Sequence, residues 1–140
     1  MADPRMDVGA DPAHFAWLED RLYEHNVRAT GIDDGEWISV VVRGDGGEIV
    51  AGLGGSTWGG TLEVKQLWVQ EAHRGSGLGI GMLKAAEVEA VRRGCTQAVL
   101  STYDFQAPGF YARHGYVPIA TLDDYPRGHR SFTMRKSLPG

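Results

Sequence analysis

The sequence has little cysteine and no long uninterrupted run of apolar residues. Its one cysteine, Cys95, has no partner for a disulfide within the chain, and the opening residues MADPRMDVGADP contain no apolar run of the kind found in signal peptides. No stretch approaches the roughly 20 apolar residues that a membrane-spanning helix needs. These absences predict a soluble protein in a reducing compartment, by default the cytoplasm, without a membrane partner.

Positive charge is also scarce. The chain has 14 Lys and Arg residues against 18 Asp and Glu residues, a formal net charge of −4. Without a bulk positive field we expect no nucleic-acid partner, and an anionic ligand must be held by a local site. No group of His, Cys and carboxylates has metal-ligand spacing, so we expect no metal. Cys95 follows a predicted helix end and is interpreted as a small buried residue rather than a nucleophile.

What the sequence does have is the length and apolar content of one ordinary domain. It contains 140 residues, 42% of them hydrophobic and 23% charged, enough for a single core. We therefore predict one domain over residues 1–140. Residues 1–12 are polar and rich in turn formers, which predicts a flexible tail or a short edge strand near residues 5–8.

Apolar spacing and turn residues predict the order helix, three strands, helix, strand, helix, two strands. The first helix begins at Pro12 with Asp11 as its cap. The three strands form an antiparallel meander, and the later strand after a helix suggests a parallel crossover. The expected ranges are a helix over 12–30, strands over 36–43, 48–58 and 61–69, a helix up to Arg93 ended by Gly94, a strand over 97–102, a short helix within 106–116, and strands over 117–122 and 131–138.

The stretch HRGSGLGIGMLKAAE contains glycine at positions 75, 77, 79 and 81, where the second long helix should begin. Each glycine inside a helix costs about 1 kcal/mol relative to alanine. That cost is understandable if bare backbone N–H groups are needed there, because a helix N-terminus is a ready site for phosphate.

Three phosphate-binding patterns can be compared with this spacing. A P-loop needs a lysine followed by Ser or Thr, which is missing, and the dinucleotide fingerprint needs glycine where Ile80 or Met82 stands. The pattern R-x-x-G-x-G does fit, as Arg74, Gly77 and Gly79. It resembles the pyrophosphate-binding motif Q/R-x-x-G-x-G/A of the GCN5-related N-acetyltransferases (GNAT family).

A second segment strengthens this resemblance. FYARHGY, residues 110–116, is similar to the family's FYxxxGF segment, and the order of predicted elements also matches over roughly residues 13–138. The resemblance implies an α/β (α+β) fold of GNAT type: a mixed, mostly antiparallel twisted sheet of six to seven strands, flanked by three to four helices, with a central parallel strand pair.

The resemblance also implies which residues bind the coenzyme, acetyl-CoA. The strand before the glycine loop offers backbone groups to the pantetheine arm and the thioester, and the loop amides hold the pyrophosphate. The implied set is Leu67, Trp68, Val69, Arg74, Gly75, Ser76, Gly77, Leu78, Gly79, Ile80, Ala107, Phe110 and Tyr111. In one departure, Asp104 stands where many relatives carry an Asn that contacts pantetheine, and a carboxylate cannot donate the amide's hydrogen bonds.

For the chemistry, Tyr111 matches the family tyrosine that often acts as general acid toward the coenzyme sulfur. The alternative is a tyrosine packed on the core. Glu63, on the strand leading to the site, is either the general base, directly or through water, or a surface residue. Glu71 and Asp104 are comparable candidates for the base, and His73 is better explained as a surface residue or phosphate neighbour.

These inferences together predict an N-acetyltransferase that moves an acetyl group to a primary amine by direct transfer in a ternary complex. An acidic chain without an appended domain favours a small-molecule acceptor over a protein or peptide amine; a non-catalytic acyl-CoA sensor is the alternative from another class. The loop DDYPRGHR, with Tyr125, either borders the acceptor pocket or is a solvated turn. The resemblance also implies a homodimer. The acceptor, the base and the acyl chain length stay open.

Overall fold

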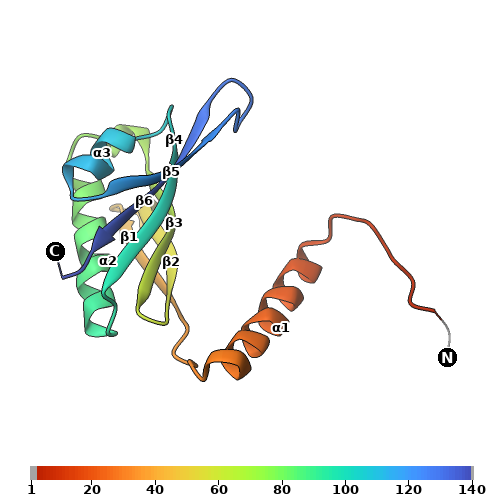
Figure 1. The fold of residues 1–140 in the computed structure, drawn as a ribbon. Helices are drawn as coiled ribbons and strands as arrows, with labels where there is room; N and C mark the ends of the chain where they lie inside the picture. The colour runs from red at the N-terminus through yellow and green to blue at the C-terminus, as the bar shows by residue number, and fades with distance from the viewer. Residues whose placement is uncertain (1–2, 140) are drawn as a thin grey trace. The chain divides into compact units, whose positions relative to one another are not determined.

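The computed structural model of the chain describes residues 3–139. The chain divides into two compact units, one ending at Asp33 and one beginning at Asp34, and each is described by itself (Figure 1). The single domain expected over 1–140 stays a prediction, and its residues 1, 2 and 140 lie outside the described residues.

The N-terminal unit contains helix α1, Pro12–Thr30, as predicted. Asp11 caps it, because its carboxylate accepts a hydrogen bond from the backbone N–H of Ala13 at 2.9 Å. Gly31 ends it in the left-handed conformation and donates its N–H to the Val27 carbonyl at 2.7 Å. Residues 3–11 form neither helix nor strand, so the alternative of a short edge strand over 5–8 is not realised; the described residues of this unit contain no strand with which it could pair.

The second unit is built on one sheet, with six strands among the described residues. They are β1 (Glu36–Arg43), β2 (Ile49–Trp58), β3 (Thr61–Val69), β4 (Gln97–Tyr103), β5 (Val117–Asp123) and β6 (Arg130–Ser137). Their order is β1-β2-β3-β4-β6-β5. Every pair is antiparallel except β3–β4, which is parallel. This confirms the predicted mixed sheet with a central parallel pair.

The parallel pair is joined over only part of its length. Residues Thr61–Val64 pair with Gln97–Leu100, while both strands continue beyond that point. A β-bulge on β3 places Lys65 opposite no residue of β2, between Val64 and Gln66. The partner at the bulge is Gly55, where a Cβ would lie 2.1 Å from the carbonyl oxygen of Glu63, so only glycine fits. The bulge therefore marks the point where β3 and β4 separate.

Two α-helices accompany this sheet: α2 (Leu78–Arg92) and α3 (Pro108–Arg113), with the short 3₁₀ helix η1 (Glu71–His73) before α2. The helix predicted to reach Arg93 ends one residue earlier, because Arg93 is its cap and Gly94 follows with φ of 90°. With α1 this gives three α-helices in the described part, as expected. Over residues 3–139, no helix has both the length and the apolar composition needed to cross a membrane.

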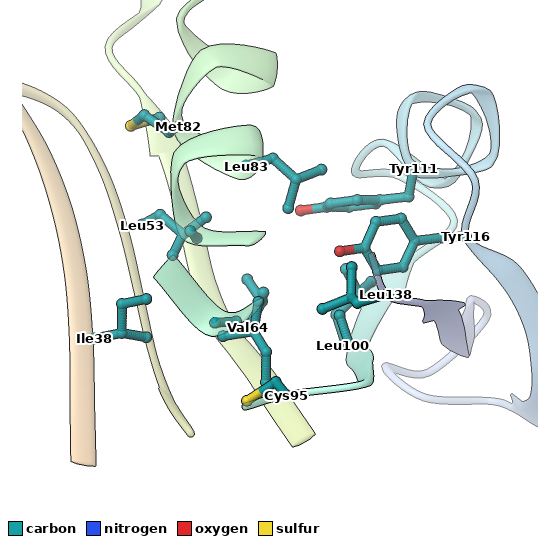
Figure 2. Packing of buried hydrophobic residues seen from close by; sticks show 14 of the residues in the cluster. Ile38, Leu53, Val64, Met82, Leu83, Cys95, Leu100, Tyr111, Tyr116 and Leu138 are labelled. Carbon is teal, nitrogen blue, oxygen red and sulfur yellow. The ribbon is translucent and has the colours of Figure 1, made fainter. Parts of the chain in front are cut away.

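The core of this unit lies between the sheet and its two helices. Met82 and Leu83 of α2 pack onto the inward side chains of the strands, among them Leu53 and Val64 (Figure 2). Tyr111 of α3 belongs to the same buried cluster. Because α2 and α3 both contribute to this one cluster, the start of α2, the end of β3 and α3 are held around the separated ends of β3 and β4.

Candidate active site

A cleft of about 830 Å³ opens where β3 and β4 separate. Its walls are the second half of β3, the loop and first turn of α2, the end of β4 and the start of α3. This volume lies within the range of roughly 300–1,000 Å³ typical of small-molecule sites. Twelve of the thirteen residues that the resemblance assigns to the coenzyme line it, all except Ser76. The sequence-derived set is thus gathered around one cavity, while its contact with a coenzyme stays a prediction.

The glycine loop forms one end of the cleft. Gly75 and Gly77 have φ of 79° and 84°, left-handed values that favour glycine. Gly77 is the N-cap of α2 and provides no side-chain acceptor for the helix amides. The first main-chain bond of the helix runs from the N–H of Gly81 to the carbonyl of Gly77 at 3.1 Å. The N–H groups of residues 78–80 therefore precede the helical bonding and are available to an anion.

Arg74 adds a cation beside these amides. Its Nε donates a hydrogen bond to the carbonyl oxygen of Val69, the last residue of β3, at 3.0 Å. This bond uses the Nε edge of the guanidinium and anchors the side chain at the cleft wall, while the terminal Nη groups make no hydrogen bond within residues 3–139. The loop therefore combines fixed amides with a fixed positive charge, which suits a pyrophosphate.

The open edge of β3 forms a second wall. Beyond Val64, the main-chain groups that face β4 have no partner on that strand. Leu67 and Val69 turn their side chains toward the core, so Trp68 points away from it. An elongated ligand with amide groups can add hydrogen bonds along this edge in the manner of an extra strand.

Tyr111 lies both in the cleft and in the core. Its side chain is 9% exposed and lines the cleft. The ring packs edge-on against Phe110 and Tyr116, with centroid distances of 5.2 and 5.8 Å. Figure 2 shows Tyr111 beside Tyr116. Burial raises the pKa of this phenol above its ordinary value of 10, so the hydroxyl is protonated at neutral pH. The two interpretations of Tyr111 from sequence, a cleft residue and a core residue, therefore describe the same side chain.

The candidates for the general base do not all line the cleft. Glu63 lies opposite Ser56 and Val99 in the paired part of the sheet, exposed, and is outside the cleft lining. Glu71, in η1, is also outside the lining, whereas His73 is part of it.

Both carboxylate oxygens of Asp104 contact residues outside the cleft lining. One carboxylate oxygen meets Nδ1 of His129 at 2.9 Å and the other accepts the backbone N–H of Arg130 at 3.0 Å. The side chain is thereby directed to the start of β6 rather than along the cleft.

Cys95 is buried, and burial raises the pKa of its thiol, so the thiolate form is disfavoured. This agrees with the interpretation of Cys95 as a packing residue. Over residues 3–139, no three side chains of His, Cys, Asp or Glu stand close enough together to hold a metal ion.

Sequence reasoning missed part of the cleft wall, namely Ser101, Thr102, Phe105 and Gln106. Gln106 fixes this turn, since its side-chain oxygen accepts hydrogen bonds from the N–H of Tyr103 at 2.9 Å and the hydroxyl of Thr102 at 3.3 Å. The sequence held a signal for them, because Ser101 and Thr102 lie in the last part of β4 and Phe105 and Gln106 follow it, at the strand end where open α/β sheets bind ligands.

The fold and this cleft agree with the family to which the chain is similar. The sequence pattern of the acetyltransferase (GNAT) family matches residues 6–116. The chain belongs to the GNAT family and is an N-acetyltransferase by that membership.

The known proteins to which the chain is similar include the following three. A blasticidin-S acetyltransferase of Streptomyces morookaense is 43% identical over 96 residues, covering 68% of this chain and 71% of its own. An acetyltransferase of Agrobacterium fabrum is 34% identical over 119 residues, covering 85% and 87%. The crystal structure of an acetyltransferase from Bacillus cereus superposes with a TM-score of 0.80 at 28% identity, over 96% of this chain and 98% of that one.

Proposed function

We propose that the protein transfers the acetyl group of acetyl-CoA to the primary amine of a small molecule, directly and within a ternary complex. The observation that carries this proposal is the junction of the anion-binding loop, residues 74–80, with the open edge of β3 in one cleft. A coenzyme with a pyrophosphate at one end and an amide-rich arm is the ligand whose chemistry matches both parts.

Each part of the cleft has its own role in the proposed reaction. The amides at residues 78–80 and Arg74 hold the pyrophosphate, and the unpaired main-chain groups at the edge of β3 hold the arm and polarise the thioester carbonyl. Tyr111 is the general acid toward the departing sulfur. Its raised pKa keeps the proton in place until a thiolate develops, so its role is to hydrogen-bond to that sulfur and release the proton late.

Direct transfer fits the nucleophiles that this chain offers. A covalent acetyl-enzyme would need an activated side chain, and the thiol of Cys95 is buried with its pKa raised. The acceptor amine therefore attacks the thioester itself. The small-molecule acceptor is supported by the blasticidin-S acetyltransferase, which shares 43% identity with the chain over 96 residues.

The test begins with coenzyme binding. We expect calorimetric titration with acetyl-CoA to give saturable binding by the wild type and none by Gly79→Glu. A Cβ at Gly79 lies at ordinary contact distance, 3.5 Å, from Phe110, so the variant's main effect is to bring a carboxylate among the amides. Gly81→Glu is the matched control, because position 81 has no atom within 4 Å of a Cβ and is outside the cleft lining.

We expect the wild type and Gly81→Glu to bind acetyl-CoA and Gly79→Glu not to bind it. Equal binding by all three would reject the loop as the pyrophosphate site. Absence of binding by the wild type would reject the coenzyme itself.

We also propose a homodimer formed through the edge of the sheet at β5. This strand pairs with β6 on one side only, so its other edge is open to a second copy. Light scattering should give about twice the 15.2 kDa mass of one chain. A mass equal to one chain would reject the dimer.

A further inference from the structure

The loop between β5 and β6, residues 124–129, is tied to the end of β4. The N–H of Asp104, one residue after β4, donates to the carbonyl of Arg130 at 3.0 Å, and the carboxylate of Asp104 accepts the N–H of Arg130 at the same distance. Within the loop, the Asp124 carboxylate accepts the N–H of Gly128 at 2.9 Å. These bonds hold His129, the residue before Arg130, at a fixed place beside β4.

His129 is oriented by a carboxylate. Its Nδ1 lies 2.9 Å from Oδ1 of Asp104, and its side chain is 48% exposed. Because an ionised carboxylate only accepts hydrogen bonds, Nδ1 carries the proton in the neutral imidazole and Nε2 keeps its lone pair. Nε2 has no hydrogen-bond partner among residues 3–139, so it is free to accept a proton.

Phe105 connects this histidine to the cleft. The rings of Phe105 and His129 meet edge to face, with centroids 5.0 Å apart, and Phe105 lines the cleft. Tyr103 stacks on the Phe105 ring at 5.3 Å and meets Tyr125 edge-on at 5.4 Å. Phe105 is the member of this aromatic cluster that lines the cleft, and it follows the end of β4, so His129 lies one ring contact from that end of the cleft.

We propose that His129 is the general base that deprotonates the acceptor amine, and that Asp104 is its positioning residue. This inference rests on the proposed function. His129, Asp104 and Glu63 all lie outside the cleft lining, but His129 contacts Phe105, which lines the cleft, and is held by a carboxylate at 2.9 Å. In this proposal the acceptor amine enters over Phe105, the cleft residue that the imidazole contacts.

Two protons leave the amine nitrogen during the reaction. The ammonium group loses one proton to Nε2 of His129, and the freed lone pair forms the C–N bond to the thioester carbon. The C–S bond of the resulting adduct breaks with its electron pair on sulfur, which takes the proton of Tyr111. The second proton of the amine nitrogen restores the phenol through water, and the imidazolium releases its own to solvent. The products are the amide, the free thiol and one proton.

The charged groups around the imidazole are few. Asp104 is the one that contacts its ring; the neighbouring Arg130 is paired with Asp123 at 3.0 Å, and the carboxylate of Asp124 is bonded to Gly128. Tyr125 donates its backbone N–H to the carbonyl of His129 at 3.1 Å, a contact that does not involve the ring. Because Nε2 must be unprotonated before it can accept a proton, turnover at saturating amine should fall toward acid pH.

The experiment compares wild type, His129→Ala and Asp104→Asn with acetyl-CoA and a panel of primary amines that includes blasticidin S, measuring thiol release from pH 5 to 9. We expect His129→Ala to bind acetyl-CoA as the wild type does in calorimetry. Its kcat should fall by about 100-fold or more, and it should lose the acidic limb. Added imidazole should restore a large part of the rate in His129→Ala. Asp104→Asn should lose about 10-fold in kcat without such rescue, because its own imidazole is still present but less well oriented.

His14→Gln is the matched control, since His14 is also an exposed histidine beside an aspartate, Asp11, and has no place in the proposal. If the wild type binds and turns over but His129→Ala keeps its rate and its pH profile, His129 is not the base. A loss of rate without rescue by imidazole, or a loss of coenzyme binding, would indicate a structural role and also overturn the proposal. No turnover by the wild type with any amine would instead reject the proposed function.

Discussion

The Nε of Arg74 donates a hydrogen bond to the carbonyl oxygen of Val69 at 3.0 Å, which joins the anion-binding loop to the last residue of β3. Arg74→Gln removes the charge beside the α2 amides. We expect the Kd for acetyl-CoA to rise by about 10- to 100-fold, the equivalent of one charge-assisted contact worth roughly 1.5–3 kcal/mol. Calorimetric titration measures this change directly.

The control for that variant is Arg43→Gln. Arg43 also donates to a backbone carbonyl, that of Gly47 at 2.9 Å, but it lies outside the cleft lining. Its loss should leave the Kd unchanged. Equal weakening by both variants would mean that net charge, rather than a local contact, holds the coenzyme.

Tyr111→Phe tests the general acid. Phenylalanine fills the same buried space, so we expect acetyl-CoA affinity and thermal midpoint to change little, while kcat falls by about 100-fold. Because burial raises the pKa of Tyr111 above 10, ionisation of this residue should produce no basic limb in the wild-type kcat profile below about pH 10. Initial rates of thiol release from pH 7 to 10 give both results.

This variant also separates the enzyme from a coenzyme sensor. A sensor has no turnover to lose and would bind acetyl-CoA equally well with either residue. A wild-type rate that Tyr111→Phe retains in full would assign the residue to packing alone.

Features encoded by neighbouring residues could be predicted from the sequence. Asp11 and Pro12 mark the start of α1, and the spacing of Arg74, Gly77 and Gly79 marks the loop before α2. The contact of Asp104 with His129 could not be predicted in this way, because 25 residues separate them and the contact depends on how β6 pairs with β4. The need for glycine at position 55, opposite the bulge of β3, could not be predicted either, because the atom that excludes a Cβ there is the carbonyl oxygen of Glu63 on the next strand.

Glu89→Gln should weaken the unit in a pH-dependent way. Hydrogen bonds from Arg92 and then Arg93 lower the pKa of this carboxyl from 4.5 to about 2. A lowered pKa in the folded state stabilises the protein above about pH 4.5, and that contribution is lost as the pH falls toward 2. The thermal midpoint of the variant should therefore lie below that of the wild type at pH 7 and approach it at pH 3.

Arg93 explains why this half-buried carboxylate affects folding. It also donates to the carbonyl of Trp37 at 3.0 Å and to the hydroxyl of Thr57 at 3.1 Å, and so links the end of α2 to β1 and β2. Glu19→Gln, on α1, is the control, and its midpoint should follow the wild type at both pH values. A difference in thermal midpoint between Glu89→Gln and the wild type that is the same at pH 3 and pH 7 would contradict the lowered pKa of Glu89.

Tyr116→Phe tests the buried polar contact that holds α2 against the segment after α3. The hydroxyl of Tyr116 donates to Oε2 of Glu87 at 2.7 Å, and Nζ of Lys136 approaches Oε1 at 2.8 Å. Loss of the hydroxyl leaves a largely buried carboxylate with one donor fewer, which should cost about 1.5–3 kcal/mol in the free energy of unfolding at pH 8. The urea midpoint measures it, and the slope of the transition should be unchanged.

The same contact predicts an alkaline effect of definite sign. Burial, followed by the bond to Glu87, raises the pKa of Tyr116 well above 10. The unfolded chain therefore releases this proton first, and the wild type loses stability as the pH rises above about 10, whereas Tyr116→Phe has no such proton to lose. The difference between the two urea midpoints should thus narrow from pH 8 to pH 11. A difference that widened over that range would show that the phenol is ionised in the folded protein and would refute the buried hydrogen bond.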